Sequence, residues 1–501
     1  MNRHVPSAAS NLHRMTSHAK HSPPPPCPSG ITLGDVDASF RTVALCFLAK
    51  SILWLIVASV LLLLASVKLH APAMMSKTAW LTYGRLAPAG WDAFVYGFAA
   101  QAAFAVGLWV LARSSMQRLQ QPLLVFLGSC FWNLGTLFGT VGILAGYSTG
   151  REWLEMPPGA MACLVMGAGL LGAAGWLTFS ARTATETYPS AWFVLLALLS
   201  FVWFGTVGLM MLSGETPIGI LQVLVQRWYA NGVLQLFLGA IGLAVVFHFL
   251  PQWLNRPLAS RQLALMSFWC LAFFAPWAIT EHGDPFPRWI VSAGLAGQFF
   301  AAIGILATGM NWWKTSEGAV GNLMNNLSGR LLGIAALSYL AAGALDCLFS
   351  LQRFSSWSRF TWTHSGLEWL LVGGAVGLAL FAVLPEFIFR ATGRTLAPRW
   401  IALHAVLSIV GVLLTALPLI LGGVFQGVRM ADPAMPFVDA LRKSMHLVRL
   451  SSLGLVVFLV AQLSLAAAFA GLFKGLVMEW INALKSWSVP TPKDRTAGAR
   501  S

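Results

Sequence analysis

Residues 44–67 read ALCFLAKSILWLIVASVLLLLASV, a run of 24 residues in which Lys50 is the only charged side chain. An α-helix rises 1.5 Å per residue, so a run of this length can cross a hydrocarbon core of about 30 Å. Eleven further apolar runs of similar length follow along the chain. Their approximate ranges are 91–113, 122–146, 157–180, 188–212, 231–250, 262–280, 287–311, 327–351, 365–387, 401–425 and 449–475.

The composition agrees with this pattern, because 57% of the 501 residues are hydrophobic and only 10% are charged. Soluble proteins carry about a quarter charged residues. Inside a bilayer every backbone polar group must be paired within the protein, which favours helices over lipid-exposed strands. The sequence therefore predicts an all-α membrane protein with twelve transmembrane helices. Its loops are too short to hold a large soluble domain.

The net charge of +15 indicates orientation in the membrane, and we expect no nucleic-acid partner. An even number of spans places both termini on one side, and the loops on that side hold more Lys and Arg than the opposite loops. The positive-inside rule then predicts that both termini are cytoplasmic. The basic residues on the opposite side include Arg429, Arg442, Lys443 and Arg449.

The two ends of the chain differ in composition from the rest. Residues 1–40 are polar and basic and contain a proline run, which is typical of a disordered cytoplasmic tail. Four histidines in this tail could bind a metal loosely, but the simpler interpretation is a solvated segment. We expect residues 41–480 to form the twelve-helix membrane domain and residues 481–501 to form a basic cytoplasmic tail.

The six cysteines are too scattered to form a known cofactor motif. The sequence has no C-x-x-C and no C-x-x-C-H, which excludes covalently attached heme, a zinc ribbon and an iron–sulfur signature. Walker A, G-x-S-x-G and H-E-x-x-H motifs are also absent. Most of the cysteines lie within the apolar runs and are expected to be small core residues.

Polar residues near the helix ends are the candidates for function, because placing them in a bilayer is costly unless they are paired or used. The segment FTWTHSGLEW (residues 360–369) places His364 and Glu368 at the start of the tenth run. Glu386 and Arg390 are spaced to pair on one helical face. Taken singly, such residues are more often interfacial than functional. The others are Asp92, His248, Glu281, His282, Asp346, His404 and His446.

Three stretches resemble subunit I of the heme–copper oxidases, and most closely the cbb3-type cytochrome c oxidases and the large subunit of nitric oxide reductases. They are WYANGVLQLFLGAIGLAVVFHFLPQWLNRPLASRQL (228–263), FFAPWAITEHGDPFPRW (273–289) and TWTHSG (361–366). RLAP (85–88) and GVFQG (423–427) are similar too. The resemblance covers nearly the whole chain after residue 40 and implies the same twelve-helix bundle.

The resemblance implies a low-spin heme b, a high-spin heme and a copper ion held by six histidines. His364 stands at the position of a low-spin heme ligand, and His282 stands at the position of a copper ligand. The other four positions hold residues that are not histidine. Gly90 replaces the second low-spin heme ligand, Trp362 the high-spin heme ligand, and Asn231 and Glu281 two copper ligands.

Four of the six ligands are thus absent, and none of the three redox centres is complete. The interpretation that follows is a cbb3-type oxidase-like protein of a respiratory electron-transport complex, with a degenerate active site and no oxygen-reducing centre of its own. Neither heme b nor copper is then expected at full occupancy. The alternatives are a working terminal oxidase subunit with cytochrome c as donor, a protein with a single heme on His364, and a twelve-helix transporter.

The resemblance also implies the surroundings of the protein. We expect a multi-pass protein of the bacterial inner membrane, in contact with the lipid bilayer and with the other subunits of a cytochrome c oxidase. The outer-side loops 281–288 and 352–363 are the expected surfaces for a partner or an electron donor.

Overall fold

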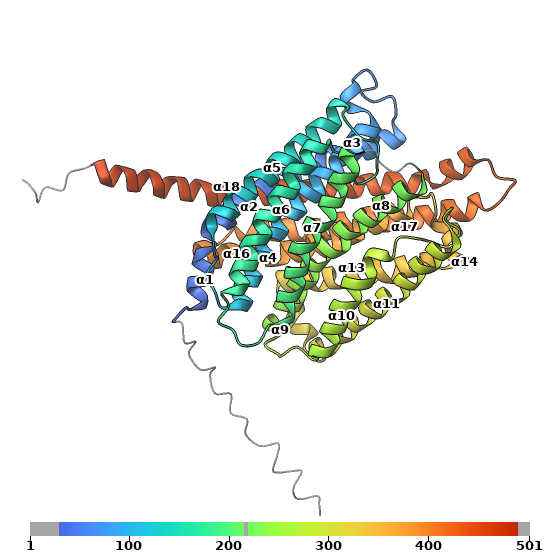
Figure 1. Cartoon of the computed structure of the whole chain (residues 1–501). Helices are drawn as coiled ribbons and strands as arrows, with labels where there is room; N and C mark the ends of the chain where they lie inside the picture. Colours follow the sequence, from blue (N-terminus) through green and yellow to red (C-terminus); the bar gives the residue numbers. More distant parts are fainter. Residues whose placement is uncertain (1–29, 215–218, 489–501) are drawn as a thin grey trace, which may run out of the picture.

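A computed structural model describes residues 30–214 and 219–488, and the chain forms one helical bundle (Figure 1). Among the described residues, eleven helices are long and apolar enough to cross a membrane. They are Arg41–His70 (α2), Tyr83–Ser115 (α3 to α4), Pro122–Ala145 (α5), Pro158–Ser180 (α6), Pro189–Ser213 (α7), Ile220–Leu254 (α8 to α9), Arg288–Ser316 (α11), Leu327–Ser350 (α13), Thr363–Thr392 (α15 to α16), Pro398–Met430 (α17) and Phe437–Gly475 within α18 (Phe437–Ser488).

The twelfth expected span, 262–280, is shorter than the sequence predicted. It forms the 14-residue helix α10 (Arg261–Phe274), followed by a single 3₁₀ turn, η4 (Ala275–Trp277). Pro276 lies in that turn, where its ring prevents the helix from continuing. The predicted twelve helices thus become eleven long spans and the shorter α10, which packs along α11.

Both ends of the described chain emerge at the same end of the bundle (Figure 1). We call it the α1 end, after the short helix α1 (Leu33–Ser39), and the opposite end the α14 end, after α14 (Gln352–Ser358). Residues 33–39 are therefore helical, although the sequence placed them in a disordered tail. Residues 1–29, with the four tail histidines, lie outside the described residues. Helix α18 continues past the expected boundary at residue 480.

Three spans form the centre of the bundle, and each contains a π-helical segment. In each of these three spans, 94–100% of the most apolar stretch of 18 residues is buried inside the protein. In the other eight spans the buried share of that stretch is 28–56%. In the first of these spans, η2 (Ala93–Ala99) joins α3 (Tyr83–Asp92) to α4 (Ala100–Ser115). In the second, η3 (Gly232–Gly239) joins α8 (Ile220–Asn231) to α9 (Ala240–Leu254). In the third, η5 (Trp369–Gly377) joins α15 (Thr363–Glu368) to α16 (Leu378–Thr392). Such segments often lie at functional sites. Here Gly90, Asn231 and His364 each lie within five residues before one of them.

At the α1 end, a buried polar network joins the N-terminal helix to the bundle. Asp37 of α1 accepts hydrogen bonds from the Arg113 guanidinium at 2.7 Å and from the Trp109 indole at 2.8 Å.

The predicted pair of Glu386 and Arg390 is confirmed, with Arg390 Nε 2.7 Å from Glu386 Oε1. The remaining loop elements are η1 (Ala79–Leu81) and α12 (Val320–Met324).

Aromatic side chains fill the space between the central helices and α18. The ring centroid of Trp369 lies 5.3 Å from Trp91, 5.2 Å from Phe94 and 5.6 Å from Phe458. Aromatic pairs at these separations stabilise a core beyond the area that they bury. This cluster lies directly beside Gly90, the neighbour of Trp91 in the chain.

Candidate functional site

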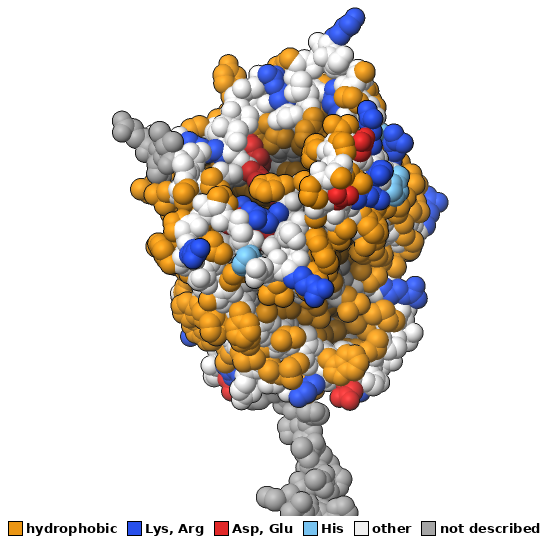
Figure 2. Space-filling view, turned by 90° about the vertical axis from the view of Figure 1, so that its right-hand side faces the viewer, with side chains coloured by type: hydrophobic (Ala, Val, Ile, Leu, Met, Phe, Trp, Pro, Cys, Tyr) orange, Lys and Arg blue, Asp and Glu red, His pale blue; other side chains and the backbone are white. Residues whose placement is uncertain are grey.

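A cavity of about 500 Å³ lies at the α14 end of the bundle, where Figure 2 shows hollows between apolar, acidic and basic side chains. Its walls come from the loop after α5, from α8, from the loop after η4, from α11 and α13, and from α15. Among its lining side chains are five carboxylates, two guanidinium groups and one imidazole. They are Glu152, Glu281, Asp284, Asp346 and Glu368, with Arg227, Arg359 and His364.

His364 and Glu281 contact each other in this cavity, with His364 Nε2 3.0 Å from Glu281 Oε1. The hydroxyl of Thr361 accepts a hydrogen bond from the Thr363 amide, which fixes the first turn of α15 and points the next residue at the cavity. The second carboxylate oxygen of Glu281 is buried and has no hydrogen-bond partner. His364, at the expected heme-ligand position, therefore lies beside Glu281, at an expected copper-ligand position, and the two are in contact through an imidazole and a carboxylate.

Asp284 holds the loop that carries Glu281. Its Oδ2 accepts from Arg227 at 2.7 Å and from the backbone amide of Glu281 at 2.8 Å, and Arg359 lies 3.5 Å from its Oδ1. The Asp284 side chain is only 4% exposed, and a buried carboxylate is tolerated when cations pair with it, as the two arginines do here. Both guanidinium groups are thereby engaged at one wall of the cavity.

Asn231 uses its amide group to hold the end of α10. Its Nδ2 donates to the carbonyl oxygens of Ala275 and Ala278, at 2.7 and 3.1 Å. These carbonyls lie at the 3₁₀ turn, where the helical pairing of α10 ends. Both amide hydrogens are therefore committed to the backbone, and Asn231 acts as a structural link between two helices.

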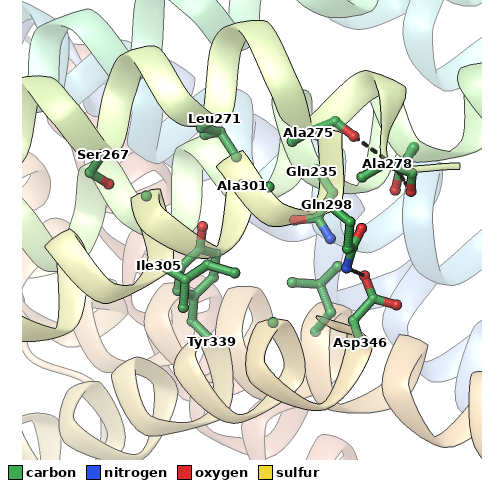
Figure 3. Close-up of a pocket in the computed structure, with 14 residues that line it drawn as sticks. Gln235, Ser267, Leu271, Ala275, Ala278, Gln298, Ala301, Ile305, Tyr339 and Asp346 are labelled. Atoms are coloured by element: carbon green, nitrogen blue, oxygen red, sulfur yellow. Dashed lines mark hydrogen bonds between the residues drawn. The ribbon is translucent and has the colours of Figure 1, made fainter. Parts of the chain in front are cut away.

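A smaller pocket of about 30 Å³ continues from the cavity into the bundle, and Figure 3 shows its lining. The two spaces share Asn231, Gln235, Gln298 and Asp346. Gln298 Nε2 donates to Asp346 Oδ2 at 2.8 Å. The pocket extends toward Ser267 and Tyr339, and its volume suits about one ordered water.

Gly90 points away from this cavity, toward α2. A Cβ atom added at Gly90 would lie 2.8 Å from Leu62 Cγ and 3.1 Å from the Leu62 backbone nitrogen. Carbon atoms in contact normally stay about 3.5–4.0 Å apart. A side chain at the position where the resemblance expects a histidine would therefore force Leu62 to move.

The remaining expected ligand positions are also placed apart. Trp362 is partly buried against the core, and its indole nitrogen is buried without a partner. The backbone of His282 is tied down, since its amide donates to Ser350 and its carbonyl accepts from Ser355. His282 is absent from the cavity lining, whereas Glu281 belongs to it.

The other histidines lie elsewhere in the described part of the chain. His248 is buried near the α1 end beside Gln252 and Ser190. His404 is buried against the Ala461 carbonyl, and its Nε2 has no partner. His446 is exposed. Between residues 30 and 488, as far as the structure describes them, no group of three His, Cys, Asp or Glu side chains is arranged to hold a metal ion.

Sequence reasoning noted Asp346 and Glu368 only as single polar residues, and it missed Asp284, Gln298 and the two cavity arginines. These side chains come from separate helices and loops. For Asp284 and the two arginines the available signal was a position near the ends of apolar runs on one predicted side, whereas Gln298 lies in the middle of the run 287–311. Nearby, the loop residue Glu155 lies at the same end, and burial together with the charge of Glu152 raises its pKa to about 7.

Comparison with known proteins places this geometry in a family. The model of cytochrome c and quinol oxidase polypeptide I matches residues 42–457. The cbb3-type cytochrome c oxidase subunit CcoN1 of Stutzerimonas stutzeri is 24% identical over 397 residues, which cover 76% of this chain and 82% of that protein. Cytochrome c oxidase subunit 1 of Rhodobacter capsulatus is 25% identical over 431 residues, covering 79% of this chain and 78% of that protein.

The fold agrees with these matches. A solved heme–copper terminal oxidase dimer superposes with a TM-score of 0.63 at 12% identity, over 86% of this chain and 84% of that chain. The alternative of a transporter unrelated to the oxidases is therefore wrong. The chain belongs to the family of cytochrome c and quinol oxidase polypeptide I.

Proposed function

We propose that this chain is a cbb3-type oxidase-like component of a bacterial respiratory complex that has lost its own oxygen-reducing centre. It keeps the subunit I bundle, and it serves as a structural or assembly partner in the membrane. The proposal rests on how the side chains at the six expected ligand positions are used.

The residues present do not fit a low-spin heme with two axial bases. Such a heme needs a ligating side chain on each face of the iron. At Gly90 a side chain would collide with Leu62, and the adjacent space is filled by the rings of Trp91, Phe94 and Trp369. This packing against Leu62 is the single observation that carries the proposal.

The residues do not fit a copper centre either. Copper favours several imidazoles, whereas Asn231 and Glu281 offer oxygen atoms. The Asn231 amide donates both hydrogens to backbone carbonyls, and Glu281 is already in contact with His364. These contacts favour a structural role at both positions, and no redox step is assigned to them.

The family match and the distribution of charge support a proposed orientation and proposed partners. The positive-inside rule favours an orientation with the α1 end in the cytoplasm and the α14 end, with its cavity, on the outer side of a bacterial inner membrane. The loops 281–288 and 352–363 then face the outer side and are the proposed contact surface for other oxidase subunits.

The test is optical. Membranes from heme-replete cells that express the protein are examined as dithionite-reduced minus air-oxidised spectra, and iron and copper are measured on the purified chain. We expect no stoichiometric metal and no b-type bands assignable to the chain. The variants His364→Ala and His446→Ala are compared, the second being an exposed histidine at the same end. Bands that disappear only in His364→Ala would overturn the proposal.

A further inference from the structure

The cavity at the α14 end is lined by more acidic than basic side chains. Of its five lining carboxylates, Asp284 is paired with both Arg227 and Arg359. The five carboxylates thus face two guanidinium groups and the imidazole of His364, so acidic groups outnumber basic groups by two. The carboxylates that pair with no arginine are those of Glu152, Glu281, Asp346 and Glu368. We propose that this cavity is a binding site for a small organic cation of the ammonium type, which enters from the α14 end.

The size and lining of the cavity suit such a ligand better than a bare metal ion. Pockets for small molecules have volumes of about 300–1,000 Å³, and this one measures about 500 Å³. Its carboxylates come from different elements and have separate contacts, Glu281 with His364 and Asp346 with Gln298. Trp153 also lines the cavity, and an indole face attracts ammonium groups.

Asp346 is the deepest of these carboxylates and the main counter-charge that the ligand would meet. It lines both the cavity and the smaller inner pocket, and Figure 3 shows its side chain beside Gln298. Within the described ranges no Lys or Arg forms an ion pair with it, and its one hydrogen bond comes from the neutral amide of Gln298. A carboxylate inside a bundle is costly without a compensating charge, and a bound ammonium group would supply one.

Glu281 supplies a second, independent indication of a missing partner. One of its oxygens contacts His364, while the other is buried and accepts no hydrogen bond. A buried polar atom without a partner costs free energy. An N–H group of a ligand in the cavity could satisfy this oxygen.

The ligand would enter only from the α14 end. At the opposite end α1 closes the bundle through the buried Asp37–Arg113 pair, and Arg390 lies 3.9 Å from the same carboxylate. This inference rests on the proposed function, because a resident heme or copper ion would take up part of the same space.

The experiment compares labelling rates of single cysteines by thiosulfonate reagents of opposite charge. In a variant in which all native cysteines are replaced by serine or alanine, one cysteine is placed in the cavity wall with Ala230→Cys. The matched control is Ser356→Cys, which is exposed on α14 at the same end but outside the cavity. Intact spheroplasts and inverted vesicles are treated with a trimethylammonium reagent or with a sulfonate reagent.

The quantity to compare is the ratio of the labelling rate by the cationic reagent to that by the anionic reagent. In spheroplasts we expect this ratio to be about tenfold or more higher at Ala230→Cys than at Ser356→Cys, because charged clefts concentrate counter-ions. Adding Asp346→Asn and Glu281→Gln should abolish the difference. Tetramethylammonium in the medium should slow labelling in the cavity and leave the control unchanged. Equal preference at the two sites would overturn the inference. So would labelling of Ala230→Cys only in inverted vesicles while Ser356→Cys is labelled in spheroplasts.

The spectrum of the same membranes separates the two proposals. Charge-independent labelling without heme bands would overturn the cation site alone. Heme bands that depend on His364, together with a cysteine that neither reagent reaches, would overturn the proposed function and the cation site with it.

Discussion

At Gly90, close packing against Leu62 gives a physical reason why the histidine of the heme-binding pattern is absent. The substitution Gly90→Ala places a Cβ atom 2.8 Å from Leu62 Cγ, and we expect this overpacking to cost about 1–3 kcal/mol of stability. The matched control is Gly84→Ala in the same helix, where a Cβ meets nothing within 4 Å. Thermal unfolding of both purified variants in detergent provides the measurement.

A second substitution makes this prediction sharper. Leu62→Ala removes the side-chain atoms that the new methyl group would meet and leaves only the backbone nitrogen at 3.1 Å, so Gly90→Ala should cost less in that background than in the native chain. If Gly90→Ala is neutral, or if Leu62→Ala does not relieve its cost, the Leu62 side chain is not what disfavours a side chain at residue 90.

Glu155 predicts a pH dependence of stability. Burial, with the charge of Glu152, raises its pKa from an ordinary 4.5 to about 7. Between these values the folded chain binds more protons than the unfolded chain, so this residue's contribution to stability is complete below about pH 4.5 and is lost as the pH rises through 7. Glu155→Gln should flatten the fall in unfolding temperature between pH 5 and pH 7.5, and an unchanged profile would contradict the assignment.

At the scale of elements, α1 offers an internal comparison between a buried and an exposed ion pair. The side chains of Asp37 and Arg113 are only 5% and 6% exposed, whereas those of Asp35 and Arg118 are 36% and 55% exposed. Asp37→Ala leaves a buried guanidinium unpaired, which typically costs about 3–5 kcal/mol. Asp35→Ala should cost much less, because exposed pairs contribute little.

The readouts are the thermal unfolding temperature and the rate at which added protease cleaves near α1. We expect both to change strongly in Asp37→Ala, and the double variant Asp37→Leu with Arg113→Met to recover most of the loss, since a buried pair can be replaced by apolar groups. Equal effects of Asp35→Ala and Asp37→Ala would show that α1 is held by its cap and apolar contacts, not by the buried pair.

The elements themselves were predictable where a single strong effect decides them. Runs of about 20 apolar residues must span a bilayer as helices, so the long spans followed from the sequence, as did the pairing of Glu386 with Arg390. The early end of α10 was not predicted, because the apolar run continues through Pro276. The π segments were not predicted either, since they change the register of side chains without changing hydrophobicity.

At the scale of the whole molecule, the family followed from the order of short motifs, but the site did not. The resemblance placed His364 and Glu281 at ligand positions of the family, and nothing in the sequence indicated that these two side chains meet. Their contact depends on how α15 packs beside the loop after η4. The cavity around them gathers residues from positions 152 to 368, and no local pattern specifies such an arrangement.

The whole bundle should be equally stable with or without heme in the cell. A ligand present at 100 times its Kd stabilises the folded state by about 2.7 kcal/mol, so a resident heme would leave a clear thermal signature. The rings of Trp91, Phe94, Trp369 and Phe458 already fill the space beside Gly90. We therefore expect protein from heme-deficient and heme-replete cells to unfold at the same temperature. A lower unfolding temperature from heme-deficient cells, restored by added hemin, would mean that the bundle is completed by heme and not by its own side chains.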